Sequence, residues 1–510
     1  MMMMMMMMMM MMMMMMMLLP IQMESAYLLI HTTYLPTLPH ISCKGPLMLD
    51  TYSRIHRYIA IQYLKKRRET QISFESMMMM MMMMMMMILF PIQMESAMCN
   101  SGDAKPGPPN LSPVVDSFEQ TTVQTSEYGK RVLITSREHQ VEMNVLHMYG
   151  DDPYEWGKAH GELMKKEIQE FIPKVKEYVA SEIKNDSKLE WAIELGVDVA
   201  LDLSYEVTKK YTPSYVMQEI RGISDGSGVH VDDIRRVMWL GELTRGSCSM
   251  FGAWGNATRD SRDGKLLQLR ALDWDTEGPF RDYHLITVYH PSESSEFNTF
   301  ANLGFVGWIA SITGMNRNGL SVSEIGVSMP DASFGKERYL APGYPFGFLI
   351  RDILQSDRSL DDSINRIENA KRTCDLLLGV GDGNANAFRG FQYAPDVANV
   401  FDDENLEPVE DWHQRIDDVV YWGMDWVCPV DNRFLHDQLV KYHGNISAEV
   451  TIRNMLSYVG TGDLHIAIYD HFNSLMYVST AASRNQTGPL EAYRRPFLKL
   501  DMGKIWEESI

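Results

Sequence analysis

The chain has 510 residues and a formal net charge of −20, with 67 acidic against 47 basic residues. This length accommodates one large domain or two to four domains of ordinary size. The acidic balance argues against a nucleic-acid partner, because binding phosphates requires a concentrated basic face and the sequence contains none.

The N-terminal region is of low complexity. Residues 1–17 and 77–87 are unbroken methionine runs, and the segment PIQMESA occurs after each of them. We therefore predict that residues 1–97 are a duplicated region that does not fold. The second run is too short to cross a bilayer, although it has the length of a signal-peptide core. Residues 98–125 are rich in Pro, Gly and Ser and are predicted to be a linker.

Residues 126–247 are predicted to be mainly helical. Two short strands are predicted at the start of this part, over residues 131–149. Apolar side chains then recur at spacings of three and four over residues 164–183, which indicates an amphipathic helix that Pro173 should kink or split. Further helical stretches lead up to Cys248.

Strands dominate the chain after Cys248. Short runs rich in β-branched and aromatic residues follow one another, with amphipathic helices predicted over residues 346–370 and 448–458. Many strands with few helices predict an α+β domain over residues 248–510, in which helices cover stacked sheets.

Cys248 lies at the boundary between the predicted helical part and the predicted strand-rich part of the chain. Most cysteines in such a place are small apolar core residues. Here, however, a strand leaves Cys248, turns in a polar loop around residue 259 and returns, so a symmetric hairpin sets Arg270 opposite Cys248. Arg270 could then hold a thiolate or a carboxylate, and Asp273 could hold an ammonium group. Because alternation places residues 270 and 273 on opposite faces, the hypothesis requires the strand to bend between them.

A cysteine without a histidine partner can be activated by its own α-amine. If the bond between Ser247 and Cys248 is cut, an amine with a pKa of about 7.7 to 8.0 lies beside a thiol with a pKa near about 8.5 and can act as its base. In this hypothesis the Cys248 thiol attacks the Ser247 carbonyl, and hydrolysis of the resulting ester makes the helical half a separate chain.

Several segments, taken together and in order, resemble the amino-terminal nucleophile hydrolases of the choloylglycine hydrolase, acid ceramidase and penicillin acyltransferase group. The resemblance covers residues 130–500 and is greatest for acid-ceramidase-like members. The segments are EWGKAHGELM at 155–164, EIRGISDGSG at 219–228, CS at 248–249, LRALDWD at 269–275, GMNRNGLSVSEIGV at 314–327, VYWGMDWVCP at 420–429 and TGDLHIAIYD at 461–470.

The resemblance implies an αββα sandwich in which Cys248 is the nucleophile, Asp273 binds its α-amine and Arg270 supports the thiolate. The enzyme would cut itself between Ser247 and Cys248, and the two pieces would stay associated. It would then hydrolyse a linear amide of an N-acylated lipid such as ceramide through an acyl-thioester, in transient contact with lipid or membrane. Neither a metal nor an organic cofactor is implied.

The chain departs from the family pattern in two places. Gly326 stands where relatives have an asparagine, so one donor to the oxyanion is missing. The later family asparagine has no clean match, and Asp425 and Asn432 are the candidates for it. Glu324 is a further acid within range of the site.

Two alternatives use the same fold. An amine or thiol could take the acyl group in place of water, which would make the protein an acyltransferase. The protein could also be an inactive binding or scaffold protein that no longer cuts itself.

Other motifs are weaker. The G-x-S-x-G match at 222–226 lacks the strand that a serine-hydrolase elbow needs before it. The GVGDGNANAF segment at 379–388 is interpreted as a β-turn and not as a phosphate or calcium loop. His465 and His471 lack the spacing of a zinc site.

Location is inferred from the resemblance and from the cysteines. We expect a lysosomal or secreted protein. Export would permit a disulfide between Cys374 and Cys428, which leaves Cys248 free. Glycosylation is permitted at four sequons, which begin at Asn110, Asn256, Asn445 and Asn485.

Overall fold

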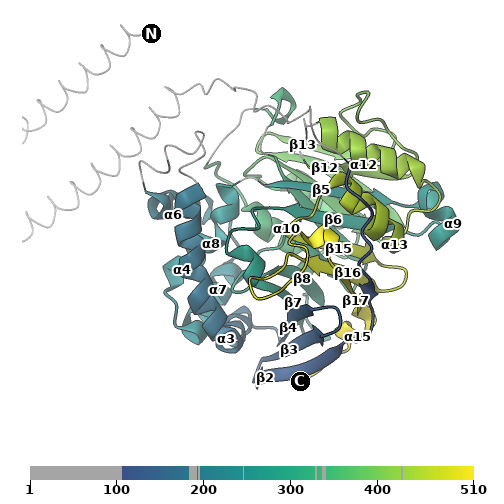
Figure 1. Ribbon diagram of the computed structural model, residues 1–510. Coiled ribbons are helices and arrows are strands. Elements are labelled where there is room, and N and C mark those ends of the chain that lie inside the picture. The colour runs from purple at the N-terminus through teal and green to yellow at the C-terminus, as the bar shows by residue number, and fades with distance from the viewer. Residues whose placement is uncertain are drawn as a thin grey trace, which may run out of the picture. The chain divides into compact units, whose positions relative to one another are not determined.

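The computed structural model describes residues 106–182, 192, 196–244, 246–327, 330–335, 340–424, 426 and 429–510 (Figure 1). Contacts between Cα atoms separate residues 1–93 from residues 94–510, and every described residue belongs to the second unit. The predicted unfolded region at 1–97, the start of the linker, Asp425 and Cys428 lie outside the described residues. None of the helices in the described ranges combines the length and apolarity needed to span a bilayer.

The part of the chain before Cys248 forms strands first and helices afterwards. The strands are β1 (Val114–Val115), β2 (Glu119–Ser126), β3 (Gly129–Ser136) and β4 (Val141–Tyr149). The helices are α3 (Pro153–Leu163), α4 (Lys165–Glu182), α6 (Val197–Thr208), α7 (Ser214–Ser227), α8 (Val231–Met238) and the 3-10 turn η3 (Leu240–Glu242). The two strands predicted over 131–149 are confirmed as β3 and β4.

Pro173 does not split its helix. It lies inside α4, which continues through it, while the chain leaves helical geometry earlier, at Met164 between α3 and α4. A proline inside a helix removes one backbone hydrogen bond. Apolar residues on both sides of Pro173, including Phe171 and Val175, are buried in the core and hold the helix in place.

Strands dominate after Cys248, as predicted. They are β5 (Ser247–Ala253), β6 (Leu267–Asp273), β7 (His284–His290), β8 (Phe300–Phe305), β9 (Thr313–Asn316), β10 (Leu320–Gly326), β11 (Leu376–Asp382), β12 (Ala387–Ala394), β13 (Val397–Phe401), β14 (Val419–Trp422), β15 (His465–Asp470), β16 (Leu475–Thr480) and β17 (Phe497–Asp501).

The helices of this part are mostly short. They are α9 (Arg259–Arg262), α10 (Phe346–Ser356), α11 (Leu360–Asn369), α12 (Pro429–Lys441), α13 (Ala448–Val450), the π-helix η7 (Thr451–Leu456), α14 (Ser457–Val459), α15 (Met502–Trp506) and the 3-10 turns η4 (Gly255–Thr258), η5 (Phe280–Asp282), η6 (Ala332–Phe334) and η8 (Ala492–Arg494). The helix predicted over 346–370 is divided into α10 and α11, because the Ser359 hydroxyl caps a new helix by accepting from the Asp362 amide.

Two sheets stack face to face and helices cover them. The seven-stranded sheet has the order β1-β17-β16-β15-β6-β5-β14, and the ten-stranded sheet has the order β13-β12-β11-β10-β9-β8-β7-β4-β3-β2. Strands β5 and β6 contact β10 across the interface. Helices α10 and α11 pack on the ten-stranded sheet, and α12 packs on β14 of the other (Figure 1). The predicted α+β class with αββα layers is confirmed.

The chain before Cys248 is built into both sheets. Strand β4 pairs in parallel with β7, and β1 pairs in parallel with β17. Its helices also pack closely on one another, since a Cβ at Gly157 of α3 would lie 2.0 Å from the Glu219 carbonyl oxygen of α7. The G-x-S-x-G match at 222–226 lies inside α7, where a Cβ at Gly222 would lie 2.1 Å from the Tyr154 oxygen. These glycines therefore serve helix packing and not a nucleophile elbow.

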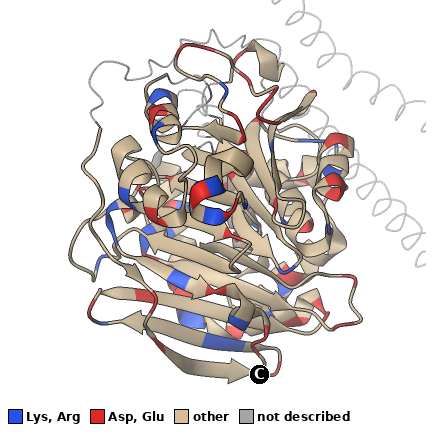
Figure 2. Cartoon of the chain, turned by 90° about the vertical axis from the view of Figure 1, so that its right-hand side faces the viewer, with Lys and Arg blue, Asp and Glu red and all other residues tan. Residues whose placement is uncertain are grey.

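Charged side chains are dispersed over the fold. Figure 2 shows lysines and arginines scattered over strands and helices among aspartates and glutamates.

Candidate active site

Cys248 is the second residue of β5, between β6 and β14, and only 1% of it is exposed. The prediction that Arg270 lies opposite Cys248 is wrong by two residues. Cys248 pairs with Leu272, Met250 pairs with Arg270, and Ser247 pairs with Asp273. The connection between the strands contains η4 and α9, so it does not close symmetrically about residue 259.

The bend predicted between residues 270 and 273 is not needed either. Pairing of β5 with β6 continues in register to Asp273. Successive side chains therefore alternate between two faces of this ladder. We call them the inter-sheet face, with Cys248, Met250, Arg270 and Leu272, and the helix-side face, with Ser247, Ser249, Ala271 and Asp273.

Arg270 is the charged group of the inter-sheet face. Its guanidinium is fully buried and Nη2 lies 3.3 Å from Oε2 of Glu324, on β10 of the opposite sheet. Nε donates to the Ile312 carbonyl at 3.2 Å, and Nη1 donates to the Ala271 carbonyl at 2.8 Å. The cation is therefore held in one place beside the Cys248 thiol.

Burial raises the pKa of the Cys248 thiol to about 12. The nearby Arg270 guanidinium lowers this pKa, while the negative charges of Glu324 and Asp273 raise it. A thiol with a pKa this high is protonated at neutral pH. In the uncut chain Cys248 is therefore a neutral thiol that needs a base.

Asp273 is the charged group of the helix-side face. Its carboxylate accepts from the Thr461 hydroxyl at 2.6 Å, the Gly462 amide at 2.7 Å and the Asp463 amide at 3.2 Å. Burial raises the pKa of Asp273 well above its usual value, and the nearby Asp463 carboxyl raises it further. Gly462 has a φ of 83°, which lets the loop before β15 turn both amides toward Asp273.

The backbone nitrogen of Cys248 has its own acceptor. It donates to the Met424 carbonyl at 2.9 Å. Asn432 is fully buried on α12, and its side-chain oxygen accepts from the neighbouring Gly423 amide at 2.9 Å. Asn432 is not among the residues that line the cavity beside Cys248, so among the described contacts it acts on the 423–424 backbone. The other candidate, Asp425, lies outside the described residues.

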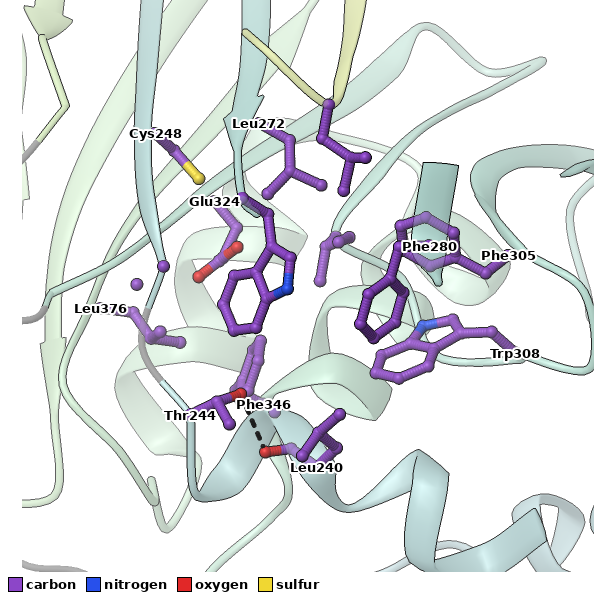
Figure 3. A pocket seen from close by; sticks show the side chains of 16 residues that line it. Leu240, Thr244, Cys248, Leu272, Phe280, Phe305, Trp308, Glu324, Phe346 and Leu376 are labelled. Atoms are coloured by element: carbon purple, nitrogen blue, oxygen red, sulfur yellow. Dashed lines mark hydrogen bonds between the residues drawn. The ribbon is translucent and has the colours of Figure 1, made fainter. Parts of the chain in front are cut away.

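An apolar cavity lies beside Cys248 (Figure 3), and the empty space in it, together with the open solvent at its mouth, is about 630 Å³. Its lining includes Leu240, Gly241, Thr244, Gly246, Cys248, Leu272, Trp274, Phe280, Phe305, Trp308, Ile312, Glu324, Gly326, Phe346, Leu376 and Leu464. Figure 3 shows Glu324 near the Cys248 sulfur and aromatic rings farther along the cavity. The first four of these residues precede Cys248, so the parts of the chain before and after the predicted cut both line the cavity.

Gly326 lies at the end of β10 and contributes no side-chain donor to the cavity. The departure from the family pattern therefore falls inside the site. The lining side chains that carry polar atoms are Cys248, Trp274, Trp308 and Glu324, after the predicted cut, and Thr244, before it. The Thr244 hydroxyl donates to the Leu240 carbonyl at 3.1 Å.

The weaker motifs lie away from this cavity. The predicted turn is confirmed over residues 383–386 only, because Gly379–Asp382 belong to β11, which pairs with β12. The His465 ring bonds the Thr313 hydroxyl at 3.0 Å, and the His471 ring bonds the Ser321 hydroxyl at 2.8 Å. Cys374 is buried.

One sequon is unsuited to a glycan in the folded chain. Asn110 is 5% exposed, and its side-chain nitrogen donates to the carbonyls of Tyr493 and Arg495. The expectation that this position permits glycosylation is corrected accordingly, whereas Asn256, Asn445 and Asn485 are exposed.

Sequence reasoning missed three residues around the nucleophile. The Ser249 hydroxyl accepts from the Met424 amide at 2.9 Å and lies 2.7 Å from the Thr461 hydroxyl. Ser249 and Thr461 belong to segments that carry the family resemblance, so their place in those motifs was an available signal. The third residue, Met424, has a φ of 59°. The sequence does not indicate this conformation, because a methionine rarely adopts a positive φ.

Solved structures with some likeness include an N-acylethanolamine-hydrolyzing acid amidase ortholog from Caenorhabditis elegans, with 14% identity and a TM-score of 0.33, covering 44% of this chain and 93% of that one. A variant of conjugated bile acid hydrolase from Clostridium perfringens has 15% identity and a TM-score of 0.32, covering 50% and 93%.

No protein-family profile matches the chain. Its sequence is 34% identical to protein dcd1B of Dictyostelium discoideum over 391 residues, which cover 72% of this chain and 76% of that protein. It is 31% identical to protein dcd1A of the same organism over 432 residues, covering 79% and 94%. At this identity and coverage, the chain belongs to the family of dcd1A and dcd1B.

Proposed function

We propose that the protein is an amino-terminal nucleophile hydrolase that cuts itself between Ser247 and Cys248 and then hydrolyses a linear amide bond. The observation that carries this proposal is the position of Cys248. Its sulfur lines an apolar cavity and lies beside a buried Arg270–Glu324 ion pair, while its nitrogen is held by the Met424 carbonyl.

The first reaction is the cut itself. The Cys248 sulfur bonds to the Ser247 carbonyl carbon, the carbon–nitrogen bond between the two residues breaks, and the thiol proton passes to the nitrogen, which becomes an α-amine. Water then attacks the thioester carbonyl, the carbon–sulfur bond breaks, and the sulfur regains a proton from the water. Arg270 is placed to stabilise negative charge that develops on sulfur.

The new α-amine then supplies the base that the neutral thiol needs. It takes the thiol proton as sulfur attacks the substrate carbonyl and gives this proton to the leaving nitrogen. Asp273, opposite Ser247 in the ladder, and the Met424 carbonyl are the acceptors proposed for this amine. Water releases the acyl group from the thioester.

The cavity supports an N-acylated lipid as the substrate, with a ceramide-like amide as the proposed case. Its wall is built from leucines, phenylalanines and tryptophans, which favour an acyl chain over a polar group. The amide carbonyl would lie at the Cys248 end, near Glu324 (Figure 3). Transient contact with a lipid surface, and a lysosomal or secreted location, go with this substrate class as part of the proposal.

The two pieces would stay together after the cut. Strands β1 and β4, from the first piece, pair with strands of the second. Glu219 of α7 and Arg351 of α10 form an ion pair at 2.7 Å, and both side chains are buried. Breaking a buried pair of this kind leaves an uncompensated charge, which costs about 3–5 kcal/mol.

Release of fatty acid tests the proposal. The full chain is incubated with N-lauroylsphingosine, and free laurate is measured beside a Cys248→Ala variant. We expect laurate from the wild type only, together with a lauroyl adduct on the piece that begins at residue 248 after acid quenching. Equal release by the variant would exclude Cys248 as the nucleophile.

An inactive binding protein is the competing function, and Gly326 favours it because no side-chain donor stands there for an oxyanion. Binding of the lipid without laurate release would support this alternative. Adding ethanolamine distinguishes acyl transfer, since a transferase would form N-lauroylethanolamine in place of laurate.

A further inference from the structure

Two buried hydroxyls connect Asp273 to the backbone that holds Cys248. The Thr461 hydroxyl lies 2.6 Å from Oδ2 of Asp273 and 2.7 Å from the Ser249 hydroxyl. The Ser249 hydroxyl in turn accepts from the Met424 amide at 2.9 Å. Neither Ser249 nor Thr461 is exposed to solvent.

The direction of each hydrogen bond in this series follows from the number of protons that each group carries. A hydroxyl has one proton to donate, and an ionised carboxylate only accepts. When Asp273 is ionised, Thr461 must therefore donate to it, which leaves Ser249 to donate to Thr461. The remaining lone pairs of Ser249 accept from the Met424 amide. A continuous series of hydrogen bonds therefore connects the Asp273 carboxylate to the backbone of Met424.

Met424, at the end of this series of hydrogen bonds, has a strained backbone conformation. Its φ of 59° is a left-handed conformation that residues other than glycine rarely adopt. Such a conformation persists only where the surroundings fix it. Here the Met424 amide donates to Ser249, its carbonyl accepts from the Cys248 nitrogen, and the preceding Gly423 amide donates to Asn432.

We propose that Ser249 and Thr461 are positioning residues that set the Met424 carbonyl and the Asp273 carboxylate as one unit around the Cys248 nitrogen. The inference rests on the proposed function. Self-cleavage converts an amide with one proton into an amine that carries up to three, so acceptors must already stand on more than one side of the nitrogen. The hydroxyl pair links two such acceptors, although Thr461 is far from Cys248 in the sequence.

Thr461→Val tests the coupling, because valine keeps the shape of threonine and removes the hydroxyl. Self-cleavage of the purified full chain is followed by intact mass, and kcat and KM are measured on N-lauroylsphingosine. A lost hydrogen bond to a charged group predicts cleavage and kcat slower by roughly tenfold to a hundredfold. KM should stay within about twofold, because neither hydroxyl lines the cavity.

Two further variants separate positioning from folding. Thr461→Ser retains the hydroxyl and should keep cleavage and kcat within about threefold of the wild type. Thr451→Val removes another fully buried threonine hydroxyl, whose partner is the Met455 sulfur at 3.8 Å, and should leave both rates unchanged. Should Thr461→Val fail to fold, Ser249→Ala interrupts the same chain and is expected to give the same split between kcat and KM.

The possible results are distinct. Wild-type rates in folded Thr461→Val and Ser249→Ala, beside a wild type that cuts itself, would overturn the inference and leave the proposed function standing. An equal loss in Thr461→Ser and Thr461→Val would also overturn it, because the hydroxyl would not be the cause. A wild type that never cuts would overturn the proposed function and the inference together.

Discussion

The two faces of the β5–β6 ladder bury charge in different ways. On the inter-sheet face, Arg270 meets Glu324 of the opposite sheet, and neutral histidines such as His465 lie in the same interface. On the helix-side face, Asp273 has no cationic partner among its described hydrogen bonds and is held by a hydroxyl and two backbone amides.

This difference divides the proposed chemistry between sulfur and nitrogen. In the proposed mechanism, the inter-sheet face carries the cation that would stabilise a thiolate, and the helix-side face carries the carboxyl that would hold an amine. Alternation of side chains along β5 and β6 achieves this separation without any bend in the ladder. Each face should therefore be open to alteration without the other.

Substitution of Arg270 should have the largest effect. Arg270→Met leaves Glu324 buried without its cation and removes the positive charge beside the thiol. We expect self-cleavage slower by more than roughly a hundredfold and unfolding easier by about 3–5 kcal/mol. Intact mass and urea denaturation measure the two effects.

Arg262→Met is the matched control for Arg270→Met. Arg262 is the last residue of α9, in the connection between β5 and β6; it is buried and pairs with Asp470 of β15. This variant should lose comparable stability and still cut itself. Loss of cleavage in both variants would mean that stability, and not the charge beside sulfur, controls the reaction.

Asp273→Asn alters the helix-side face. The amide keeps the shape of the carboxyl but loses its negative charge, so an α-ammonium group would be held less firmly. We expect turnover slower by roughly tenfold to a hundredfold, while alkylation of Cys248 by iodoacetamide accelerates less than in a Glu324→Gln variant, because the Asp273 charge raises the pKa of the thiol less than the Glu324 charge does. A large change in alkylation would show that the two faces are not separate.

Glu324→Gln should make the thiol more reactive. The Glu324 charge raises the pKa of Cys248, so its removal lowers this pKa from about 12. At any pH below the pKa the thiolate fraction then increases, and alkylation at pH 8 should be faster by roughly tenfold. Asp470→Asn, the matched buried carboxyl, should leave the alkylation rate unchanged.

The smallest expected effect is the contribution of His284 to the loss of folding stability in acid. Burial lowers the pKa of His284, whose ring packs on that of His465, to about 4 from an ordinary 6.5. The folded chain therefore binds this proton less readily than the unfolded chain, and stability is lost as pH falls from about 6.5 toward 4. His284→Phe should reduce the fall in unfolding free energy between pH 7 and 5 by about 1–2 kcal/mol, measured by urea denaturation. An unchanged slope would exclude His284 as a contributor.

Asp463, whose backbone amide donates to Asp273, changes the stability in acid in the opposite direction. Burial raises the pKa of Asp463 to about 6. The folded chain holds this proton more tightly than the unfolded chain, so protonation of Asp463 adds stability as pH falls through about 6. Protonation of His284 and protonation of Asp463 therefore change the free energy of unfolding in opposite directions as the pH falls.

Periodicity and composition predicted much of the fold. Strands after Cys248, helices before it and the stacked sheets all follow from patterns that repeat over many residues. The register of β5 on β6 was predicted wrongly, because the connecting loop folds into η4 and α9 and loop conformation has no comparable periodic signal.

The candidate site was predictable where residue type carries the chemistry. Cys248, Arg270, Asp273 and Glu324 were named from the sequence, and the structure brings them together. The hydroxyl chain was not, because Thr461 reaches Asp273 only through tertiary packing, and because the left-handed φ of Met424 depends on neighbours that lie far away in the sequence.

Intact mass and amino-terminal sequencing of the purified full chain, beside Cys248→Ala, test the central claim most directly. The account predicts a wild-type piece that begins Cys-Ser-Met-Phe and a variant that stays whole. A wild type that stays whole at both acidic and neutral pH would contradict self-cleavage and favour a binding protein built on the same fold.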